Sequence, residues 1–352
     1  MKSANSFKVI SIPGDGIGTE VTPAAIDVVN SVADKFNYQI EWQSVDWGSD
    51  FFRKNGRMMP ENGIEIMSKF DAILLGAIGT PDLPDHETLW GLLIPIRRNF
   101  DQYINLRPIK TFSGVQGPLR TTDPIDLVIV RENAEGEYSK VGGRFYEGFE
   151  NETALQVAVF TKHGIERVSK YALDIALKRR KNIVSATKSN GIIYSMPFWD
   201  EVVTRICGAN KDIKLRHVLI DALAAELVLH PERFDVIVAS NLFGDILSDL
   251  AAAMVGSIGI AASGNINPER KFPSMFEPVH GSAPDIAGKG IANPIGAIQA
   301  ATMMLRHFEL AEAANFIDAK LHELVGEGHC TGDLGGKENT KSFTEKLIAK
   351  LK

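Results

Sequence analysis

The sequence has few cysteines, no long apolar run and no excess of basic residues. Cys207 and Cys330 are the only cysteines in 352 residues, and their wide separation excludes a disulfide framework and favours a reducing compartment. The N-terminus lacks the apolar segment of a signal peptide, and no stretch reaches the length of a membrane span. A formal net charge of −6 argues against a surface for nucleic acid or anionic lipid. We therefore expect a cytoplasmic protein that binds neither nucleic acid nor membrane.

Short strand-like runs alternate with helical patterns along almost the whole chain. The length allows two compact units, and 44% hydrophobic with 23% charged residues is ordinary for globular proteins. Helical periodicity covers Pro23–Asn37 and Ile165–Arg179, which separate strands rich in β-branched residues. The expected strands are KVISI, AILLGAI, DLVIVRE, NIVSAT, HVLID and FDVIVAS. This alternation predicts an α/β fold.

Two regions depart from this alternation. Residues 136–162 contain no helical pattern and resemble strands with glycine turns, which predicts an antiparallel arm. The stretch Pro294–Val325 predicts two helices, with Asn293 as the N-cap and Pro294 at the first helical position. No linker is evident between these regions, so we expect the chain to cross between its two units more than once.

The sequence PGDGIG follows the first expected strand and resembles a dinucleotide-binding loop. That fingerprint needs Gly-x-Gly-x-x-Gly, whereas Gly14, Gly16 and Gly18 are spaced Gly-x-Gly-x-Gly. The other interpretation is a tight strand-to-helix turn that needs the backbone freedom of glycine. The motif alone does not locate a nucleotide.

Three aspartates could form a site for a divalent cation. Asp245 and Asp249 lie four residues apart in a helical pattern, so their carboxylates share one face, flanked by apolar residues. Hard cations prefer such oxygen ligands, although a solvent-exposed helix face would also explain the pair. Asp221 follows a strand and could be a third ligand or a plain helix cap.

Basic and phenolic side chains could supply the rest of an active site. Lys188 follows a strand where we expect a helix to begin, and a helix N-terminus favours the neutral amine that acts as a general base; a salt bridge is the alternative. Arg97, Arg107 and Arg131 could bind the carboxylates of a small dicarboxylate through paired hydrogen bonds, although each alone could be a surface residue. Tyr138 is a candidate proton donor.

Together these segments resemble a known enzyme family. GDGIG, NLRP, VRENAEGEY, ATKSN, SNLFGDILSD and FEPVHGSAPDIAGKGIANP are similar to the metal-dependent β-decarboxylating dehydrogenases, which act on isocitrate, 3-isopropylmalate, homoisocitrate, tartrate or D-malate. The likeness extends from about Phe7 to Phe343. The resemblance implies an α/β fold of two domains sharing a central mixed sheet, which is not a Rossmann fold.

The resemblance also implies roles for the candidate residues. Arg97, Arg107 and Arg131 would bind the substrate carboxylates. Asp245 and Asp249, with Asp221 of a second subunit, would hold Mg²⁺ or Mn²⁺; whether K⁺ is also needed stays open. Lys188, also from the second subunit, would take the proton of the C2 hydroxyl, and Tyr138 would protonate carbon after CO₂ leaves. A homodimer with shared active sites is therefore implied.

In this family the NAD cofactor lies against the segment His280–Asn293 rather than on a glycine-rich loop. The large, cofactor-binding domain would comprise residues 1–102 and 260–352, and the small, dimerisation domain would comprise residues 103–259 with its arm at about 138–162. The implied cofactor contacts are Ile12, Asn190, Glu277, His280, Gly281, Ser282, Ala283, Asp285, Ile286 and Asn293. An aspartate at position 285 indicates NAD rather than NADP.

The helix that leads to Arg97 indicates the branch of the family. Trp90, Leu93 and Ile94 lie where isopropylmalate enzymes usually carry a glutamate followed by leucines. The sequence LWGLLIPIRR resembles the tartrate/D-malate branch, so we expect oxidative decarboxylation of a small 2-hydroxydicarboxylate. A 3-isopropylmalate dehydrogenase of leucine biosynthesis is the alternative. A non-catalytic regulatory subunit is a further alternative, although such subunits lose catalytic residues that this chain keeps.

Overall fold

The computed structural model describes residues 5–119 and 123–352. They form two compact α/β units. Unit 1 comprises residues 1–102, 110–120 and 252–352, and unit 2 comprises residues 103–109 and 121–251. No helix in the described ranges is both long and apolar enough to span a membrane.

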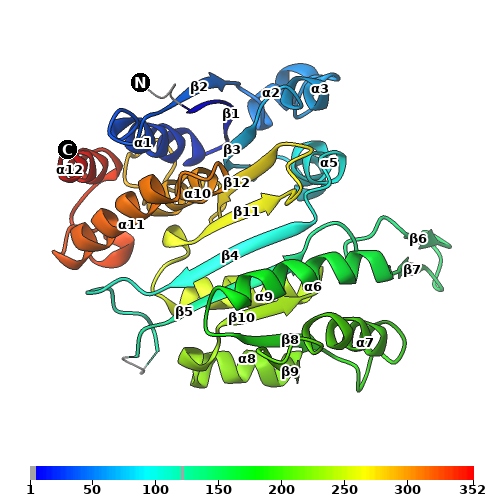
Figure 1. Ribbon diagram of the computed structural model, residues 1–352. Coiled ribbons are helices and arrows are strands. Elements are labelled where there is room, and N and C mark those ends of the chain that lie inside the picture. Colours follow the sequence, from blue (N-terminus) through cyan, green and yellow to red (C-terminus); the bar gives the residue numbers. More distant parts are fainter. Residues whose placement is uncertain (1–4, 120–122) are drawn as a thin grey trace. The chain divides into compact units, whose positions relative to one another are not determined.

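Unit 1 contains five strands in the order β2-β1-β3-β12-β11 (Figure 1). β1, β2, β3 and β12 are parallel, whereas β11 is antiparallel to β12. The strands are β1 (Asn5–Gly14), β2 (Tyr38–Ser44), β3 (Ala72–Ala77), β11 (Ala262–Ile266) and β12 (Ser274–Pro278). β3 is buried along its whole length, as expected for a parallel strand covered on both faces.

Helices α1, α10, α11 and α12 pack against one another beside this sheet (Figure 1). The helices of the unit are α1 (Gly18–Ser31), α2 (Ser49–Asn55), α3 (Gly63–Met67), α4 (Asp85–Thr88), α5 (Ile94–Asn99), α10 (Ile295–His307), α11 (Ala311–Gly326) and α12 (Thr340–Leu351). Leu89–Leu93 form a single π-helical turn, and short 3₁₀ turns span Ile258–Ile260 and Gly332–Leu334.

Unit 2 contains the strand order β4-β5-β10-β8-β9, in which β5, β10, β8 and β9 are parallel. Its strands are β4 (Ile104–Lys110), β5 (Asp126–Glu132), β8 (Asn182–Thr187), β9 (Lys214–Leu219) and β10 (Val236–Ala239). Its helices are α6 (Lys162–Leu177), α7 (Ser195–Cys207), α8 (Ile220–Leu229) and α9 (Asn241–Met254). A 3₁₀ turn spans Pro231–Arg233, and the last residues of α9 lie beyond Ala251, the end of the unit.

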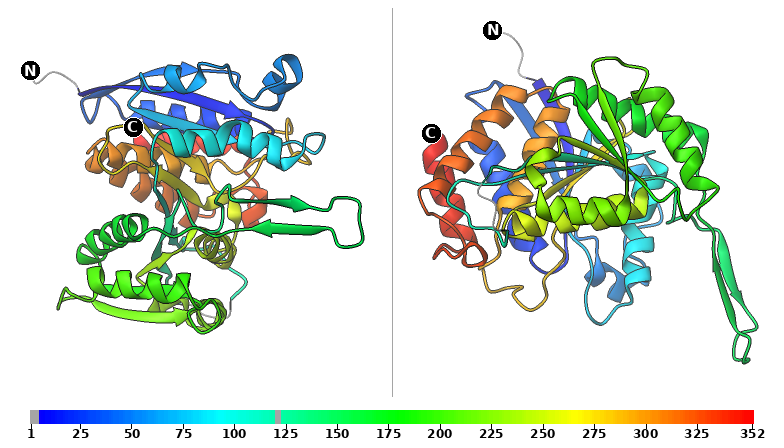
Figure 2. Two further views of the ribbon diagram at one scale, coloured as in Figure 1. Left: turned by 90° about the vertical axis from the view of Figure 1, so that its right-hand side faces the viewer. Right: turned by 90° about the horizontal axis from the view of Figure 1, so that it is seen from below.

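An antiparallel hairpin of β6 (Gly142–Phe145) and β7 (Thr153–Gln156) projects from the helices of unit 2 (Figure 2). Every residue of both strands is exposed. The segment thus has the strand-turn-strand form that its glycines and lack of helical periodicity predict.

Two expected helices differ from the structure in their bounds. α10 begins at Ile295, and Pro294 rather than Asn293 is its cap residue, although the Asn293 side chain accepts a hydrogen bond from Ile295 N at 3.0 Å. α1 spans Gly18–Ser31, so it begins before Pro23 and ends before Asn37, the two limits of the helical periodicity. A Cβ at Gly18 would lie 2.2 Å from Pro13 O, so the first turn of α1 packs closely against β1.

Candidate functional site

Arg131 is the penultimate residue of β5, and its side chain contacts the first turns of α9. Its buried guanidinium donates to Asn241 Oδ1 from Nε at 3.0 Å and from Nη2 at 2.7 Å. Nη1 forms an ion pair with Asp245 Oδ1. A Cβ on Gly244 would lie 2.6 Å from Arg131 Cβ, so glycine is what allows α9 to approach the arginine this closely.

Arg107 on β4 contacts the same face of α9. Its Nη1 donates to Asp249 Oδ1 at 2.9 Å and to Ser248 Oγ at 2.7 Å, and its Nη2 lies 3.5 Å from Asp245 Oδ1. Nε donates to Asn105 Oδ1 at 2.9 Å. Burial raises the pKa of Asp249, while the charge of Arg107 opposes that rise. The two aspartates predicted to share a face therefore do so, and two buried arginines balance their charge.

Tyr138 completes this group in unit 2. Its phenol Oη donates to Asp245 Oδ2 at 2.9 Å, and its side chain is 41% exposed. Partial burial raises the pKa of Tyr138, and the charge of Asp245 raises it further. The phenol is therefore protonated at neutral pH, as a proton donor has to be.

Two acidic residues before Tyr138 bind the starts of helices, a role that the sequence pattern does not indicate. Glu135 accepts from Thr161 N and Oγ1, both at 2.8 Å, at the start of α6. Glu137 accepts from Ser240 Oγ at 2.7 Å and Leu242 N at 3.0 Å, at the start of α9. Because these helix starts lie far from Glu135 and Glu137 in the sequence, no local signal could have indicated the contacts. Together they fix the chain segment that carries Tyr138.

Lys188 and Asp221 form a second group in unit 2. They follow the ends of the paired strands β8 and β9, and Lys188 Nζ lies 2.8 Å from Asp221 Oδ1. The hydrogen bond from Lys188 lowers the pKa of Asp221. The expectation that Lys188 begins a helix is wrong, because α7 starts only at Ser195 and a turn intervenes. Asn190 is exposed in that turn. An ion pair, rather than a helix dipole, therefore fixes the Lys188 amine.

The three candidate metal ligands do not form one cluster within the chain. Among the described residues, no group of three His, Cys, Asp or Glu side chains is placed to hold a metal ion. Asp245 and Asp249 offer carboxylate oxygens on one helix face, the donor type that hard cations prefer. Asp221 is paired with Lys188 instead. The pair on α9 fits part of a divalent site that needs a further ligand from elsewhere.

Arg97, the remaining candidate of the arginine set, lies in unit 1. Its Nη2 forms a buried ion pair with Glu277 Oε1 at 3.1 Å, and Asn265 Nδ2 donates to the same oxygen at 2.7 Å. Arg97 therefore lies next to one of the expected cofactor residues, and Asn265 is a further polar neighbour that the sequence analysis did not single out.

The residues before Arg97 are arranged by the π-helical turn Leu89–Leu93. Leu92 is fully buried in the core of unit 1, whereas Trp90 is 37% exposed and stacks over the Arg98 guanidinium at 4.8 Å. A Cβ on Gly91 would lie 2.6 Å from Met58 Cγ, so the turn packs closely on the core. Leu93 and Ile94 are half-buried.

The expected cofactor segment His280–Asn293 connects β12 to α10 and is held by the glycine turn after β1. Ile17 N donates to Ser282 O at 2.9 Å, and Gly288 N donates to Glu20 Oε1 at 2.6 Å. A Cβ on Gly16 would lie 2.0 Å from Ser282 O. These contacts give the glycine motif PGDGIG a structural role: its backbone packs against the segment His280–Asn293 and supports it.

Individual residues of the segment differ in exposure. His280 is buried, burial lowers its pKa, and its Nε2 has no hydrogen-bond partner among the described residues. Asn293 Nδ2 donates to Asp333 Oδ2 at 2.9 Å. Gly281 and Asp285 are exposed, and Ala283 and Ile286 are half-buried. Ile12, by contrast, lies with its side chain fully buried in the core. The segment thus combines an exposed, glycine-containing backbone with a buried imidazole nitrogen that is available for a hydrogen bond, and both features suit the binding of a polar cofactor.

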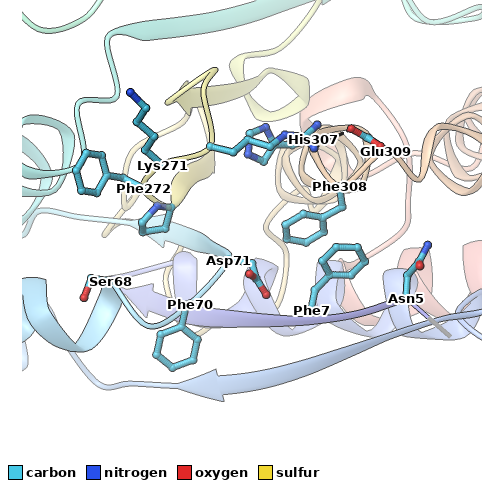
Figure 3. A pocket seen from close by; sticks show the side chains of 12 residues that line it. Asn5, Phe7, Ser68, Phe70, Asp71, Lys271, Phe272, His307, Phe308 and Glu309 are labelled. Carbon is cyan, nitrogen blue, oxygen red and sulfur yellow. Dashed lines mark hydrogen bonds and ion pairs between the residues drawn. The ribbon is translucent and has the colours of Figure 1, made fainter. Parts of the chain in front are cut away.

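A cavity of about 650 Å³ in unit 1 lies elsewhere, at the amino ends of β1, β3 and β12. Figure 3 shows Phe7, Asp71, His307 and Phe308 around it. None of the predicted site residues lines this cavity. The carboxyl end of β12, which carries Glu277, is the opposite end of that strand, and carboxyl ends are where ligands usually bind in open α/β sheets.

Comparison with known proteins identifies the family. A family model described as isocitrate/isopropylmalate dehydrogenase matches residues 8–347. The chain belongs to this family. A crystal structure of isocitrate dehydrogenase from Methylococcus capsulatus superposes with a TM-score of 0.89 and 33% identity, over 98% of this chain and 99% of that one. The predicted fold class is thereby confirmed.

Several relatives are more similar in sequence. A probable tartrate dehydrogenase/decarboxylase of Bacillus subtilis (strain 168) is 49% identical over 98% of each chain. The D-malate dehydrogenase [decarboxylating] of Escherichia coli (strain K12) is 48% identical over 97% of this chain and 98% of its own. A tartrate dehydrogenase/decarboxylase of Pseudomonas putida is 48% identical over 96% of each chain. The predicted resemblance to the tartrate/D-malate branch, and to an oxidative decarboxylating dehydrogenase, is confirmed.

Proposed function

We propose that this protein is an NAD- and divalent-metal-dependent dehydrogenase that oxidises and decarboxylates tartrate or D-malate. The observation that carries the proposal is the group on α9, in which Arg107 and Arg131 meet Asp245, Asp249 and Tyr138. It combines cations for a dicarboxylate, oxygen ligands for a metal and a protonated phenol. The names of the relatives support the substrate class.

Each side chain has a chemical task in this proposal. Arg107 and Arg131, with Arg97, bind the substrate carboxylates, because a guanidinium offers two parallel hydrogen bonds to such a group. Lys188 Nζ accepts the proton of the C2 hydroxyl, a step that requires the neutral amine and therefore loss of its ion pair with Asp221. Tyr138 Oη donates a proton to the substrate carbon that has lost CO₂. When bound, the divalent cation acts as a Lewis acid towards the substrate oxygens, and the nicotinamide accepts the electrons.

We further propose that the active unit is a homodimer that shares its sites between chains. Two observations support this: Asp221 and Lys188 form a group without Asp245 and Asp249, and the β6–β7 hairpin exposes large apolar side chains. Phe149 on its tip is 71% exposed. Such a projecting apolar hairpin is suited to packing on a second copy.

A kinetic panel tests the reaction. Tartrate, D-malate, 3-isopropylmalate and isocitrate are offered with NAD+ and with Mn²⁺ or Mg²⁺. We expect turnover of tartrate or D-malate that EDTA abolishes. Asp245→Asn should abolish turnover at ordinary metal concentrations while the protein still folds, whereas Asp174→Asn, on an exposed position of α6, should leave turnover unchanged. Preference for 3-isopropylmalate would favour the alternative substrate, and binding without turnover would favour a regulatory subunit.

Co-expression tests the shared site. Asp245→Asn and Lys188→Met should each be inactive as homodimers. In a mixed dimer, one of the two sites would combine both intact residues, so about half of the wild-type activity should return. No recovery in purified mixed dimers would place Lys188 and Asp245 of the same chain in one site.

A further inference from the structure

The first turn of α1 contacts the segment His280–Asn293 at two separate points. Ile17 N donates to Ser282 O at 2.9 Å near one end of the segment. Glu20 Oε1 accepts from Gly288 N at 2.6 Å in its second half. An acidic residue in a first helical turn is favourable in itself, but that effect does not require a hydrogen bond to a distant loop.

The other oxygen of Glu20 is in an unusual environment. Oε2 is shielded from solvent and accepts no hydrogen bond from any residue in the described part of the chain. Gly288 has φ of +76°, a conformation that side chains other than glycine rarely adopt. It follows the turn in which Ile286 N and Ala287 N both donate to Ala283 O, and that turn contains Asp285. Glu20 therefore holds the loop at the end of the turn that presents Asp285, and adds a second negative charge there.

We propose that Glu20 is a positioning residue for the dinucleotide, and that its charge contributes to the choice of NAD over NADP. The inference rests on the proposed function, because the segment binds a dinucleotide only if that function is correct. The hydrogen bond to Gly288 fixes the shape of the loop. The desolvated, unpaired Oε2 disfavours a further anion close by, such as the 2′-phosphate of NADP.

Two substitutions separate the hydrogen bond from the charge. Glu20→Gln keeps an acceptor for Gly288 N and removes the charge, whereas Glu20→Ala removes both. NADH affinity is measured by fluorescence titration, and kcat/KM is measured with NAD+ and NADP+. We expect Glu20→Ala to weaken NADH binding about tenfold, because binding then has to order a loop that a hydrogen bond to a charged group otherwise holds. Glu20→Gln should bind NADH within about threefold of wild type and should lower the NAD+/NADP+ ratio of kcat/KM.

Asp27→Asn is the matched control, since Asp27 is exposed on the same helix and the substitution removes the same charge. This substitution should change neither the NADH affinity nor the NAD+/NADP+ ratio of kcat/KM. The KM for the dicarboxylate should be unaltered in every variant. If wild type binds no NADH, the proposed function itself fails. If wild type binds NADH and both Glu20 variants match it in affinity and cofactor ratio, only this inference is overturned. Should Glu20→Ala not fold, the cofactor ratio of Glu20→Gln decides the question.

Discussion

Tyr138 Oη donates a hydrogen bond to Asp245 Oδ2 at 2.9 Å, so the candidate proton donor and a candidate metal ligand are in direct contact. Asp245 also pairs with Arg131 through its other oxygen. The carboxylate thus links the phenol of Tyr138 to the guanidinium of Arg131 on β5. Lys188, the candidate base, belongs to a different group with Asp221. This separation suggests that the two proton transfers can be disrupted independently.

Lys188→Met should lose oxidation of the 2-hydroxy acid while keeping part of the decarboxylation or reduction of a supplied 2-oxo acid. Tyr138→Phe should show the opposite bias, because it removes the donor for the carbon that has lost CO₂. Each defect should amount to about 10²–10⁴ in the affected step, the usual contribution of general acid–base catalysis. Single-turnover assays of the two partial reactions measure this. Equal losses on both partial reactions in both variants would contradict separate roles.

Gly244→Ala should impair substrate binding and stability together. The new Cβ would lie 2.6 Å from Arg131 Cβ and 2.7 Å from its Cγ, so either α9 or the arginine has to move. Overpacking of this kind costs about 1–3 kcal/mol in unfolding free energy. Denaturant titration and the KM for the dicarboxylate report the two effects. Gly332→Ala, at an exposed position where no atom lies within 4 Å of the new Cβ, is the control and should change neither. An unchanged unfolding free energy and KM in Gly244→Ala would mean that α9 moves to accommodate the new Cβ without cost.

Glu132 should make stability fall as the pH rises from about 4.5 to about 7. Burial raises its pKa to about 7 from the ordinary value of 4.5, although the amides of Ala134 and Glu135 oppose the shift. The folded state therefore holds the proton more tightly than the unfolded state does. The resulting stabilisation is complete below the unfolded pKa and is lost between about pH 4.5 and pH 7.

Unfolding free energies of wild type and Glu132→Gln, measured from pH 4.5 to pH 8, test this linkage. The neutral amide cannot titrate, so the curve of the variant should be flatter across that range. Its absolute stability is not the readout, because the amide has one acceptor oxygen in place of two. Parallel curves would show that Glu132 ionises in the folded protein much as it does in the unfolded chain.

The general fold was predictable from sequence because parallel strands buried on both faces are continuous apolar runs, as in β3 and β10. The pairing of Asp245 with Asp249 was predictable because helical spacing is local. Other features depend on contacts between distant segments. Glu135 and Glu137 bind the starts of helices that lie elsewhere in the sequence, and Gly91 of the π-helical turn Leu89–Leu93 packs closely on Met58. Periodicity carries no signal for such contacts.

Trp90→Glu, alone or with Ile94→Leu, should shift the substrate preference towards 3-isopropylmalate. Trp90 is partly exposed on the π-helical turn and stacks on Arg98, so its replacement should alter the surface near Arg97 without opening the core. A change of fit by one methylene is worth only about 1–3 kcal/mol, so the ratio of kcat/KM values should change modestly. The ratio for 3-isopropylmalate over D-malate is the measurement. If the wild type already prefers 3-isopropylmalate, the proposal that tartrate or D-malate is the substrate is wrong.

The last prediction concerns Asp285 and the choice of cofactor. Its side chain is exposed on the turn that begins at Ala283. The simpler interpretation is that Asp285 caps this turn. In the described ranges, however, no hydrogen bond to its carboxylate is formed, so the geometry gives that interpretation no support.

An aspartate at this place can accept hydrogen bonds from the two ribose hydroxyls of the adenosine in NAD. The 2′-phosphate of NADP would remove one of those donors and bring a like charge close to the carboxylate. Each effect costs on the order of 1 kcal/mol or more, so kcat/KM should favour NAD+ by at least about tenfold. Asp285→Lys should reduce or reverse that ratio, because a cation at this position attracts the phosphate. Glu312→Lys, a charge reversal at an exposed position of α11, should leave it unchanged. Equal use of both cofactors by the wild type would rule out this role for Asp285.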